Sequence, residues 1–375
     1  MLQCMETLGF DAIVIGAGIA GATTAAALAV DRRVALVEAE EAAGYHSTGR
    51  SAAIWILNYG PPDVRMLTGL SRAFFESPPP GFADAPILKH RPVVFLAPVE
   101  QQAHLQRMLG EGIGLREVSV DGVRAMVPAL RPDYAVAAAI EDDAFDMDVA
   151  ALHQGFLRQL RGLGGALSLR SRTGAIERTN GSWRVQTSHG GTFEAPVVVN
   201  CAGAWGDEVA RQAGVTPLGL VPKRRTGVVI DPAPYVATDW PMVNDVDHTW
   251  YIRPEARTRL MVSPADETDT TPHDVQPDEL DVAIAIDRMQ AAMDIEVRRV
   301  EHSWAGLRTF TPDRSLAFGW DPAAEGFFWC VGQGGYGIQT SPAAGRLAAD
   351  LIAGRDAGPA AHIVSAINPA RFAPA

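Results

Sequence analysis

The sequence predicts an α/β protein in which a parallel sheet, covered on both faces, is interleaved with an antiparallel sheet. A strand, a glycine turn, a helix and a second strand follow one another between Asp11 and Glu38. Segments 194–207 and 326–337 repeat the order of buried strand, glycine turn and helix, which is typical of parallel strands. Segments 223–231 and 249–253 alternate between apolar and polar residues, as strands of an antiparallel sheet do.

The first turn has the spacing of a dinucleotide-binding site, and its residues are Gly16, Ala17, Gly18, Ile19, Ala20 and Gly21. Gly16 permits the tight turn, Gly18 lets the backbone approach a pyrophosphate, and Gly21 lets the helix pack closely on the strand. The alanine-rich helix that follows offers free N–H groups and the positive end of its dipole. Glu38 ends the second strand, where an acid accepts hydrogen bonds from the ribose of FAD or NAD. A glycine-rich loop alone would indicate only a turn, but this context predicts a Rossmann-like domain.

The remaining elements follow from periodicity and from turn residues. Residues 44–60 start rich in glycine and hydroxyl groups and then become apolar, which predicts a loop entering a buried segment. Strands are expected over 91–97 and as a pair within 174–187, and helices over 22–30, 64–76, 148–163, 206–213, 272–293 and 338–352. These patterns divide the chain into a discontinuous cofactor domain, 1–80, 148–220 and 311–375, and a substrate domain, 81–147 and 221–310.

The composition is that of an ordinary globular protein, and we expect it to reside in a reducing cytoplasm. Of the 375 residues, 47% are hydrophobic and 20% are charged, which suits two folded domains. A net charge of -12 without a run of Lys and Arg argues against a nucleic-acid partner. Cys4, Cys201 and Cys330 form no CxxC pair and no metal-ligand spacing occurs, so neither disulfides nor a metal site is expected. Neither a signal peptide nor a membrane span is expected, because the first apolar stretch is broken by glycines.

Three glycine turns that join buried strands to helices, at Gly16, Gly203 and Gly334, suit a flavin held along its whole length better than NAD. The blocks GAGIAG, GYHSTGRSAA, RAFFESPPPGF, LHQGFLR, VVNCAGAWGD, PLGLVPKRR, SWAGLRTF and GFFWCVGQGGYGIQTS resemble the D-amino acid oxidase superfamily of FAD-dependent enzymes, with its glycine and sarcosine oxidases. Among its members the likeness is greatest to D-arginine dehydrogenase. The resemblance covers nearly the whole chain and implies a glutathione-reductase-type FAD domain interleaved with a substrate domain.

The resemblance implies that a hydride passes from the α-carbon of a D-amino acid to FAD, giving an imino acid that water hydrolyses to a 2-oxo acid and ammonia. Arg225 and Arg308 match positions that grip the substrate carboxylate, a task that suits planar guanidinium groups. Tyr59 and Tyr251 match tyrosines that close over the substrate. The implied cofactor contacts, besides the first turn and Glu38, are His46, Ser47, Thr48, Arg50, Ser51, Ala52, Gly203, Trp205, Gly334, Gly335, Tyr336, Gly337 and Ile338. From the residues alone, Arg225 also fits a solvated strand edge, and each tyrosine also fits a core.

Three positions depart from the relatives. Where D-arginine dehydrogenase has an acid for the substrate guanidinium this chain has Val93, and Ile54 replaces a histidine. Because an unpaired cation buried against apolar side chains is strongly disfavoured, we expect Ile54, Ile56 and Val93 to receive an apolar side chain, although they also fit a plain core. Gly306 occupies the place of the cysteine that tethers the flavin in sarcosine oxidases, so the FAD is expected to be noncovalent.

Other functions fit the same residues. A carboxylate grip also suits glycine and N-methylated or cyclic secondary amino acids such as sarcosine and proline, and a 2-hydroxy acid presents the same carboxylate. A flavin-binding protein without catalysis would keep the fold, and an NAD-dependent dehydrogenase would explain the first turn alone. Oxygen, a quinone or another carrier is expected as the electron acceptor, and a monomer or homodimer as the assembly.

Overall fold

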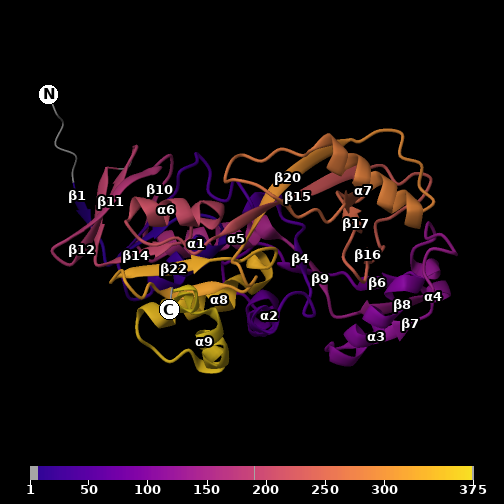
Figure 1. Ribbon diagram of the computed structural model, residues 1–375, viewed down its shortest axis with the longest axis horizontal. Coiled ribbons are helices and arrows are strands. Elements are labelled where there is room, and N and C mark those ends of the chain that lie inside the picture. Colours follow the sequence, from indigo (N-terminus) through magenta and orange to yellow (C-terminus); the bar gives the residue numbers. More distant parts are fainter. Residues whose placement is uncertain (1–6, 190, 374–375) are drawn as a thin grey trace.

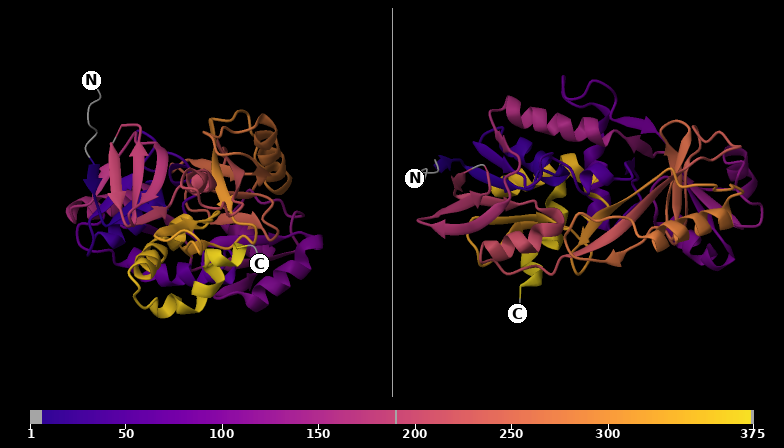
Figure 2. Two further views of the ribbon diagram at one scale, coloured as in Figure 1. Left: turned by 60° about the vertical axis from the view of Figure 1, so that its left-hand side comes forward. Right: turned by 90° about the horizontal axis from the view of Figure 1, so that it is seen from above.

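The computed structural model describes residues 7–189 and 191–373, so Cys4 lies outside the described residues. Two large sheets lie side by side along the long axis, and strands β15 (Val221–Ile230) and β20 (His302–Phe310) extend between them (Figure 1 and Figure 2). Because helices and strands are mixed along the chain and the first sheet is mostly parallel, the predicted α/β class is confirmed.

The first sheet carries the glycine turns. Its spatial order is β10 (Ala166–Ser168), β3 (Val34–Val37), β2 (Ala12–Ile15), β14 (Val197–Asn200), β22 (Phe327–Val331) and β21 (Ala317–Trp320). All neighbours are parallel except β21, which runs antiparallel to β22. Since β2, β14 and β22 are adjacent and parallel, the turns that follow them meet at one edge of the sheet. Ligands of open α/β sheets bind at such an edge.

Both faces of this sheet are covered. One face packs against α1 (Ile19–Leu28), α2 (Pro62–Glu76), α5 (Val149–Gly162) and α8 (Gly337–Ile352). The other face packs against α6 (Gly206–Gln212) and a four-stranded sheet of β1 (Thr7–Gly9), β13 (Thr192–Ala195), β12 (Ser182–Thr187) and β11 (Thr173–Thr179). Helices α1 and α8 pack so closely that a Cβ on Gly345 would lie only 2.6 Å from Cβ of Thr23, so the absence of a side chain at Gly345 permits the contact.

The second sheet has nine strands. Its order is β19 (Thr268–Asp269), β15, β18 (Arg259–Ser263), β17 (Tyr251–Glu255), β16 (Met242–Asp245), β6 (Val93–Ala97), β8 (Ala137–Glu141) and β7 (Leu115–Val118), with β20 paired to β15. Helices α7 (Glu279–Ala292) and α4 (Val120–Met126) cover one face, and α3 (Gln102–Glu111) packs on the other. The predicted antiparallel sheet is observed, with one exception, because β16 and β6 pair in parallel. These strands are far apart in sequence, so no hairpin forces them to be antiparallel.

Smaller elements complete the chain, and one predicted helix begins later than expected. A three-stranded sheet of β4 (Ile54–Trp55), β9 (Phe145–Met147) and β5 (Leu88–His90) lies between the large sheets, and α9 (Val364–Ile367) is near the C-terminus. The helix expected from Pro272 begins only at Glu279. Asp278 supplies the N-cap, because its side chain accepts a hydrogen bond from the N–H of Leu280. The residues before it form a strap, residues 264–278, that belongs to the site described below.

Within the two described ranges, no helix combines the length and the apolarity needed to cross a bilayer. Over the same residues, no group of three or more His, Cys, Asp or Glu side chains is arranged to hold a metal ion. Cys201 and Cys330 are buried, free thiols.

Candidate active site

A long cavity joins the glycine-turn edge of the first sheet to the β15–β20 pair of the second. It holds about 1620 Å³ of empty space, counting its open mouth. The predicted residues that line it are Gly16, Gly18, Ile19, Ala20, Glu38, His46, Ser47, Thr48, Arg50, Ser51, Ala52, Gly203, Trp205, Arg225, Tyr251, Arg308, Gly334, Gly335, Gly337 and Ile338. The fold therefore brings together segments that are more than three hundred residues apart in the chain, such as those of Gly16 and Ile338.

The first glycine turn is shaped by close packing on one side and left open on the other. Gly16 has φ +99°, and a Cβ there would lie 2.6 Å from the carbonyl oxygen of Cys201. A Cβ on Gly21 would lie 1.8 Å from the carbonyl oxygen of Gly16, so Gly21 acts behind the turn and does not line the cavity. At Gly18 the nearest atom to such a Cβ is Oγ1 of Thr48, at 3.3 Å. The turn thus offers bare backbone to a ligand, as a pyrophosphate requires.

The carboxylate of Glu38 is fixed over this turn. Its Oε2 accepts a hydrogen bond of 2.7 Å from the N–H of Ala17, and its Oε1 accepts one of 2.9 Å from the N–H of Glu40. Each oxygen keeps a second lone pair that can accept from a ribose hydroxyl. On the opposite side of Ala17, the carbonyl accepts from Nε2 of the buried His153, whose pKa is lowered by burial. A neutral His153 therefore braces the turn and is not free for proton transfer.

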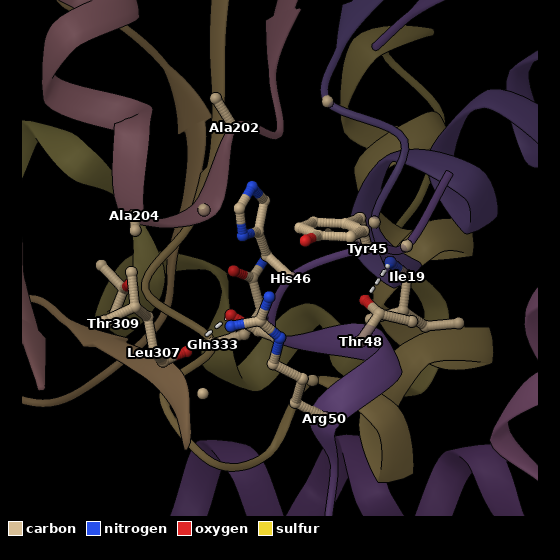
Figure 3. Close-up of a pocket in the computed structure, with 18 of the residues that line it drawn as sticks. Ile19, Tyr45, His46, Thr48, Arg50, Ala202, Ala204, Leu307, Thr309 and Gln333 are labelled. Carbon is tan, nitrogen blue, oxygen red and sulfur yellow. Dashed lines mark hydrogen bonds between the residues drawn. The ribbon is translucent and has the colours of Figure 1, made fainter. Parts of the chain in front are cut away.

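The loop 44–52 docks on the N-terminus of α1 and on β20 (Figure 3). Oγ1 of Thr48 accepts a hydrogen bond of 2.9 Å from the N–H of Ile19, the first residue of α1. Oγ of Ser47 donates one of 2.6 Å to the carbonyl of Leu307. The His46 ring lies 4.5 Å, between centroids, from the Trp205 ring. The middle of the loop is therefore held to both α1 and β20.

Arg50 lines the cavity, but its guanidinium is bound by the protein. It donates to the carbonyls of Val275 at 3.0 Å and Ala305 at 3.1 Å, and pairs with the carboxylate of Asp274 at 2.5 Å. Asp274 and Val275 belong to the strap, so Arg50 ties the strap to the cofactor-side loop.

Arg225 and Arg308 lie on neighbouring antiparallel strands. In the register of β15 and β20, Arg225 faces Gly306 and Arg308 faces Lys223, so the two arginines are diagonal neighbours on one face. Nη1 of Arg308 donates a hydrogen bond of 2.9 Å to the hydroxyl of Tyr59. A Cβ on Gly335 would lie 2.8 Å from that same nitrogen, so a side chain there would push the guanidinium away from this position. The two predicted arginines are thus brought together at the end of the cavity.

The tyrosines around these arginines are buried and electrostatically coupled to them. Burial raises the pKa of Tyr251, but the charges of Arg308 and Arg225, with hydrogen bonding, outweigh it and hold that pKa below 10.0. Burial, then the proximity of Tyr59, raises the pKa of Tyr336 to about 12. Tyr59 and Tyr336 do not line the cavity but pack edge to face, with ring centroids 5.1 Å apart. The cation end is therefore enclosed by aromatic rings with hydroxyl groups.

The predicted apolar residues lie behind the cavity wall. Ile54, Ile56 and Val93 belong to one hydrophobic cluster with Tyr251, but they do not line the cavity, and Val93 is fully buried. Other members of that cluster, Ala52, Met261 and Trp304, do line it. The wall beside the arginines is thus apolar, although its surface comes mainly from residues that sequence patterns did not single out.

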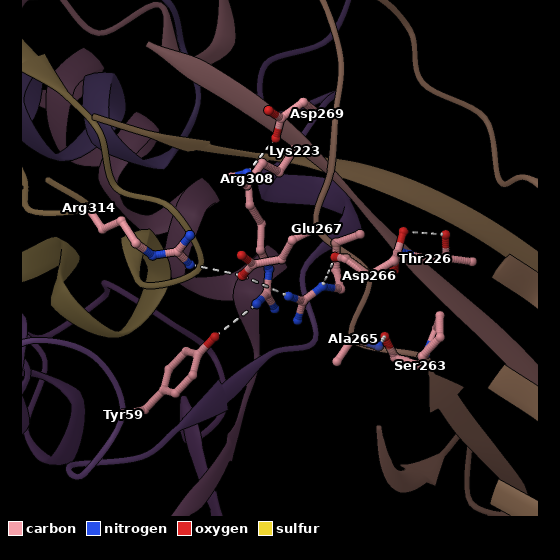
Figure 4. Close-up of polar contacts among 12 residues, drawn as sticks. Tyr59, Lys223, Thr226, Ser263, Ala265, Asp266, Glu267, Asp269, Arg308 and Arg314 are labelled. Carbon is pink, nitrogen blue, oxygen red and sulfur yellow. Dashed lines mark hydrogen bonds and ion pairs between the residues drawn. The ribbon is translucent and has the colours of Figure 1, made fainter. Parts of the chain in front are cut away.

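The strap also supplies charged residues that sequence analysis missed (Figure 4). The carbonyl of Asp266 accepts a hydrogen bond of 2.8 Å from Nε of Arg225. Oε1 of Glu267 accepts from Nη2 of Arg225 at 3.3 Å and from Nη2 of Arg314 at 3.0 Å. In sequence these residues lie in polar loops, ADETDT and TPDRS, which indicate only solvent exposure. Spatial convergence alone identifies them.

Comparisons with known proteins agree with this geometry. The family model for FAD dependent oxidoreductases (DAO) matches residues 11–351. FAD-dependent oxidoreductase domain-containing protein 1 from Xenopus laevis is 28% identical over 43% of this chain and 35% of its own length. Glycine oxidase from Geobacillus kaustophilus is 29% identical over 47% of this chain and 45% of its own length. The matched segment therefore spans less than half of each of these two relatives.

Among solved structures, the L-proline dehydrogenase from P. horikoshii has a TM-score of 0.83 and 20% identity, covering 98% of both chains. At that identity the likeness concerns the fold. The cavity fits FAD, because it offers an open glycine turn and a fixed carboxylate at one end and an enclosed pair of cations at the other. The chain belongs to the family of FAD dependent oxidoreductases, and FAD is its cofactor.

Proposed function

We propose that this chain oxidises an amino acid at its α-carbon, and that the preferred substrate is a D-amino acid with an apolar side chain. The diagonal pair Arg225 and Arg308, at the end of a cavity that fits FAD, carries the proposal. Two guanidinium groups on one face of a sheet suit a single carboxylate, which they grip through charge-assisted hydrogen bonds.

The grip would orient the substrate rather than activate it. Holding the carboxylate between two fixed cations leaves the α-carbon few orientations, and such positioning alone can lower a barrier by several kcal/mol. Bound FAD supplies a ring that accepts the hydride. The proximity of two guanidinium groups also favours the neutral form of the substrate amine, because like charges disfavour an ammonium group. The amine then loses its proton to solvent without a side-chain base.

Tyr59 and Tyr251 complete the carboxylate site. Tyr59 lies behind the cavity wall, and its hydroxyl accepts a hydrogen bond from Nη1 of Arg308 and so holds that guanidinium in position. Tyr251 is buried between the arginines and the cluster containing Met261, which places a hydroxyl on the polar side of an apolar wall. These rings exclude water from the cation end and thereby strengthen its electrostatic interactions.

The apolar wall supports the preference for an apolar side chain. Ala52, Met261 and Trp304 face the cavity, with Ile54 and Val93 packed behind them. Burial against such a wall favours an apolar group by roughly 25 cal/mol per Å², whereas a cationic side chain would need a partner. The D configuration is supported by the resemblance of the sequence blocks to D-amino acid enzymes.

A second candidate is the oxidation of glycine, sarcosine or proline. The match to a glycine oxidase favours it, and the same arginine pair would serve these substrates. The two candidates differ in the volume needed beside Met261 and Trp304, which glycine and sarcosine leave unfilled.

Anaerobic mixing of the FAD-loaded enzyme with single amino acids tests both candidates. Loss of flavin absorbance is followed for D-leucine, D-phenylalanine, D-arginine, glycine, sarcosine, L-proline and L-leucine, and air is then admitted. The proposal expects the fastest loss with D-leucine or D-phenylalanine. Faster loss with D-arginine or L-leucine contradicts it, and faster loss with glycine, sarcosine or L-proline selects the second candidate.

A further inference from the structure

A carboxylate of the chain itself lies among the guanidinium groups of the site. Glu267 bridges Arg225 and Arg314, at 3.3 Å and 3.0 Å, and Arg225 is the diagonal neighbour of Arg308. Figure 4 shows Glu267 near Arg308 and Arg314. Burial raises the pKa of Glu267, but hydrogen bonding to Arg314 and the charges of the three arginines outweigh it, so the pKa is lowered. Glu267 is therefore ionised at neutral pH. The Glu267 carboxylate thus lies within the field of three guanidinium groups.

Glu267 is held in this position by its neighbours in the strap. The carboxylate of Asp266 accepts hydrogen bonds from the N–H and hydroxyl of Thr226, at 2.7 Å and 3.0 Å. Asp269, two residues after Glu267, pairs with Lys223, which lies on β15 as Thr226 does. The part-buried hydrogen bonds of Asp266 thus hold the residue before Glu267 against β15 and place the Glu267 carboxylate next to Arg225, whereas the Asp269 carboxylate is exposed and its ion pair contributes little.

The exposed fractions of these side chains separate the inner arginine pair from the outer arginine. The side chains of Arg225 and Glu267 are 13% and 35% exposed, whereas that of Arg314 is 46% exposed. Arg308 and Arg225 line the cavity, but Arg314 and Glu267 do not. Glu267 therefore stands between the inner arginine pair and the outer, solvent-facing arginine.

We propose that Glu267 is a specificity-determining residue that restricts this site to ligands with one carboxylate. The inference rests on the proposed role of Arg225 and Arg308 as the carboxylate grip. One substrate carboxylate is matched by the inner pair, while Glu267 already occupies Arg314. A second carboxylate on the ligand would meet Glu267 as a like charge, and such juxtapositions are a common means of rejecting wrong partners. Without this charge, Arg314 becomes available to the second carboxylate.

Glu267→Gln tests the proposal because it removes the charge and keeps the size of the side chain. Acetate and malonate, which differ by one carboxylate, are titrated into the FAD-loaded enzyme, and binding is read from the flavin absorbance. The wild type is expected to bind acetate better than malonate. In Glu267→Gln the ratio of malonate affinity to acetate affinity should rise about tenfold or more. A tenfold change in this ratio corresponds to ~1.4 kcal/mol of binding free energy.

Two matched variants separate the charge from the strap. Asp269→Asn removes a carboxylate of the same strap that faces Lys223, and Glu267→Asp keeps the charge in a shorter side chain. Both should keep the malonate-to-acetate ratio within about twofold of the wild type, since surface ion pairs contribute little by themselves. A ratio that rises equally in Asp269→Asn, or that rises in Glu267→Asp as much as in Glu267→Gln, overturns the proposal.

The remaining outcomes also decide. Equal gains for acetate and malonate in Glu267→Gln would mean that the charge acts on all anions, and weaker binding of both would mean that Glu267 only holds Arg225 in place; either overturns the proposal. Flavin reduction by D-aspartate relative to D-asparagine supplies a second readout, and the same variant should raise this ratio. If no amino acid reduces the flavin, the proposed function fails while the acetate and malonate titration still tests Glu267.

Discussion

Replacing Arg308 by methionine tests the carboxylate grip most directly. Arg308 lines the cavity, and its Nη1 donates a hydrogen bond of 2.9 Å to the hydroxyl of Tyr59. Methionine keeps most of the apolar stem but removes the charge and every donor of the guanidinium. A hydrogen bond to a charged group contributes roughly 1.5–3 kcal/mol. Loss of a bidentate contact to a substrate carboxylate should therefore cost about 3 kcal/mol or more.

That free energy corresponds to a loss of at least about 100-fold in kcat/KM. Rapid anaerobic mixing separates its components, because the rate of flavin reduction at saturation reports orientation and its concentration dependence reports binding. Lys223→Met is the matched control, since Lys223 faces Arg308 across the strands but does not line the cavity. A loss of less than about fivefold in Arg308→Met, or an equal loss in Lys223→Met, would refute the assigned role.

Three further predictions concern the cofactor side and stability. Thr48→Val removes the acceptor for the N–H of Ile19, so it should lower the free energy of unfolding by about 1 kcal/mol and weaken FAD binding. Thr48→Ser keeps the hydroxyl and should leave both properties close to the wild type. Thermal unfolding measures the stability, and fluorescence titration measures the FAD affinity. Acid precipitation should release the flavin into the supernatant, because Gly306 offers no thiol; yellow colour in the pellet would contradict noncovalent binding. Burial raises the pKa of Glu141 above 4.5, so the folded state binds this proton more tightly and the stabilising contribution is lost as pH rises through the raised pKa. Glu141→Gln should therefore gain in Tm relative to the wild type as pH rises from the ordinary carboxyl range through the raised pKa, and a Tm difference that stays constant over a pH series would show that the pKa of this carboxyl is not raised.

Sequence patterns predicted the cofactor-side elements well because local chemistry dictates them. Gly16, Gly203 and Gly334 all have positive φ, and each follows a buried strand made mainly of apolar residues. Such turns tolerate few alternatives, so their residue types identify them. The prediction of a helix from Pro272 failed because Arg50 holds Asp274 and Val275 in the strap, and the N-cap Asp278 starts the helix only at Glu279.

The charged residues of the strap could not be predicted in the same way. Glu267 and Arg314 are 47 residues apart, and each lies in a loop whose composition indicates only exposure to solvent. Their pairing depends on the strap lying along β15 and on the loop after β20 turning back toward it. Both depend on tertiary contacts, which leave no periodic signal in the sequence.

The arginine pair illustrates how much of the site depends on strand register. Arg225 and Arg308 share a face only because β15 and β20 pair with Arg225 opposite Gly306. A shift of one residue would move one arginine to the face covered by α7, where Arg224 instead meets Asp281 at 2.9 Å. Gly306 has a second effect, because a side chain opposite Arg225 would fill the cavity between the loop 44–52 and the cation end. The glycine that offers no thiol to the flavin therefore also keeps the space in which the arginines would meet a carboxylate.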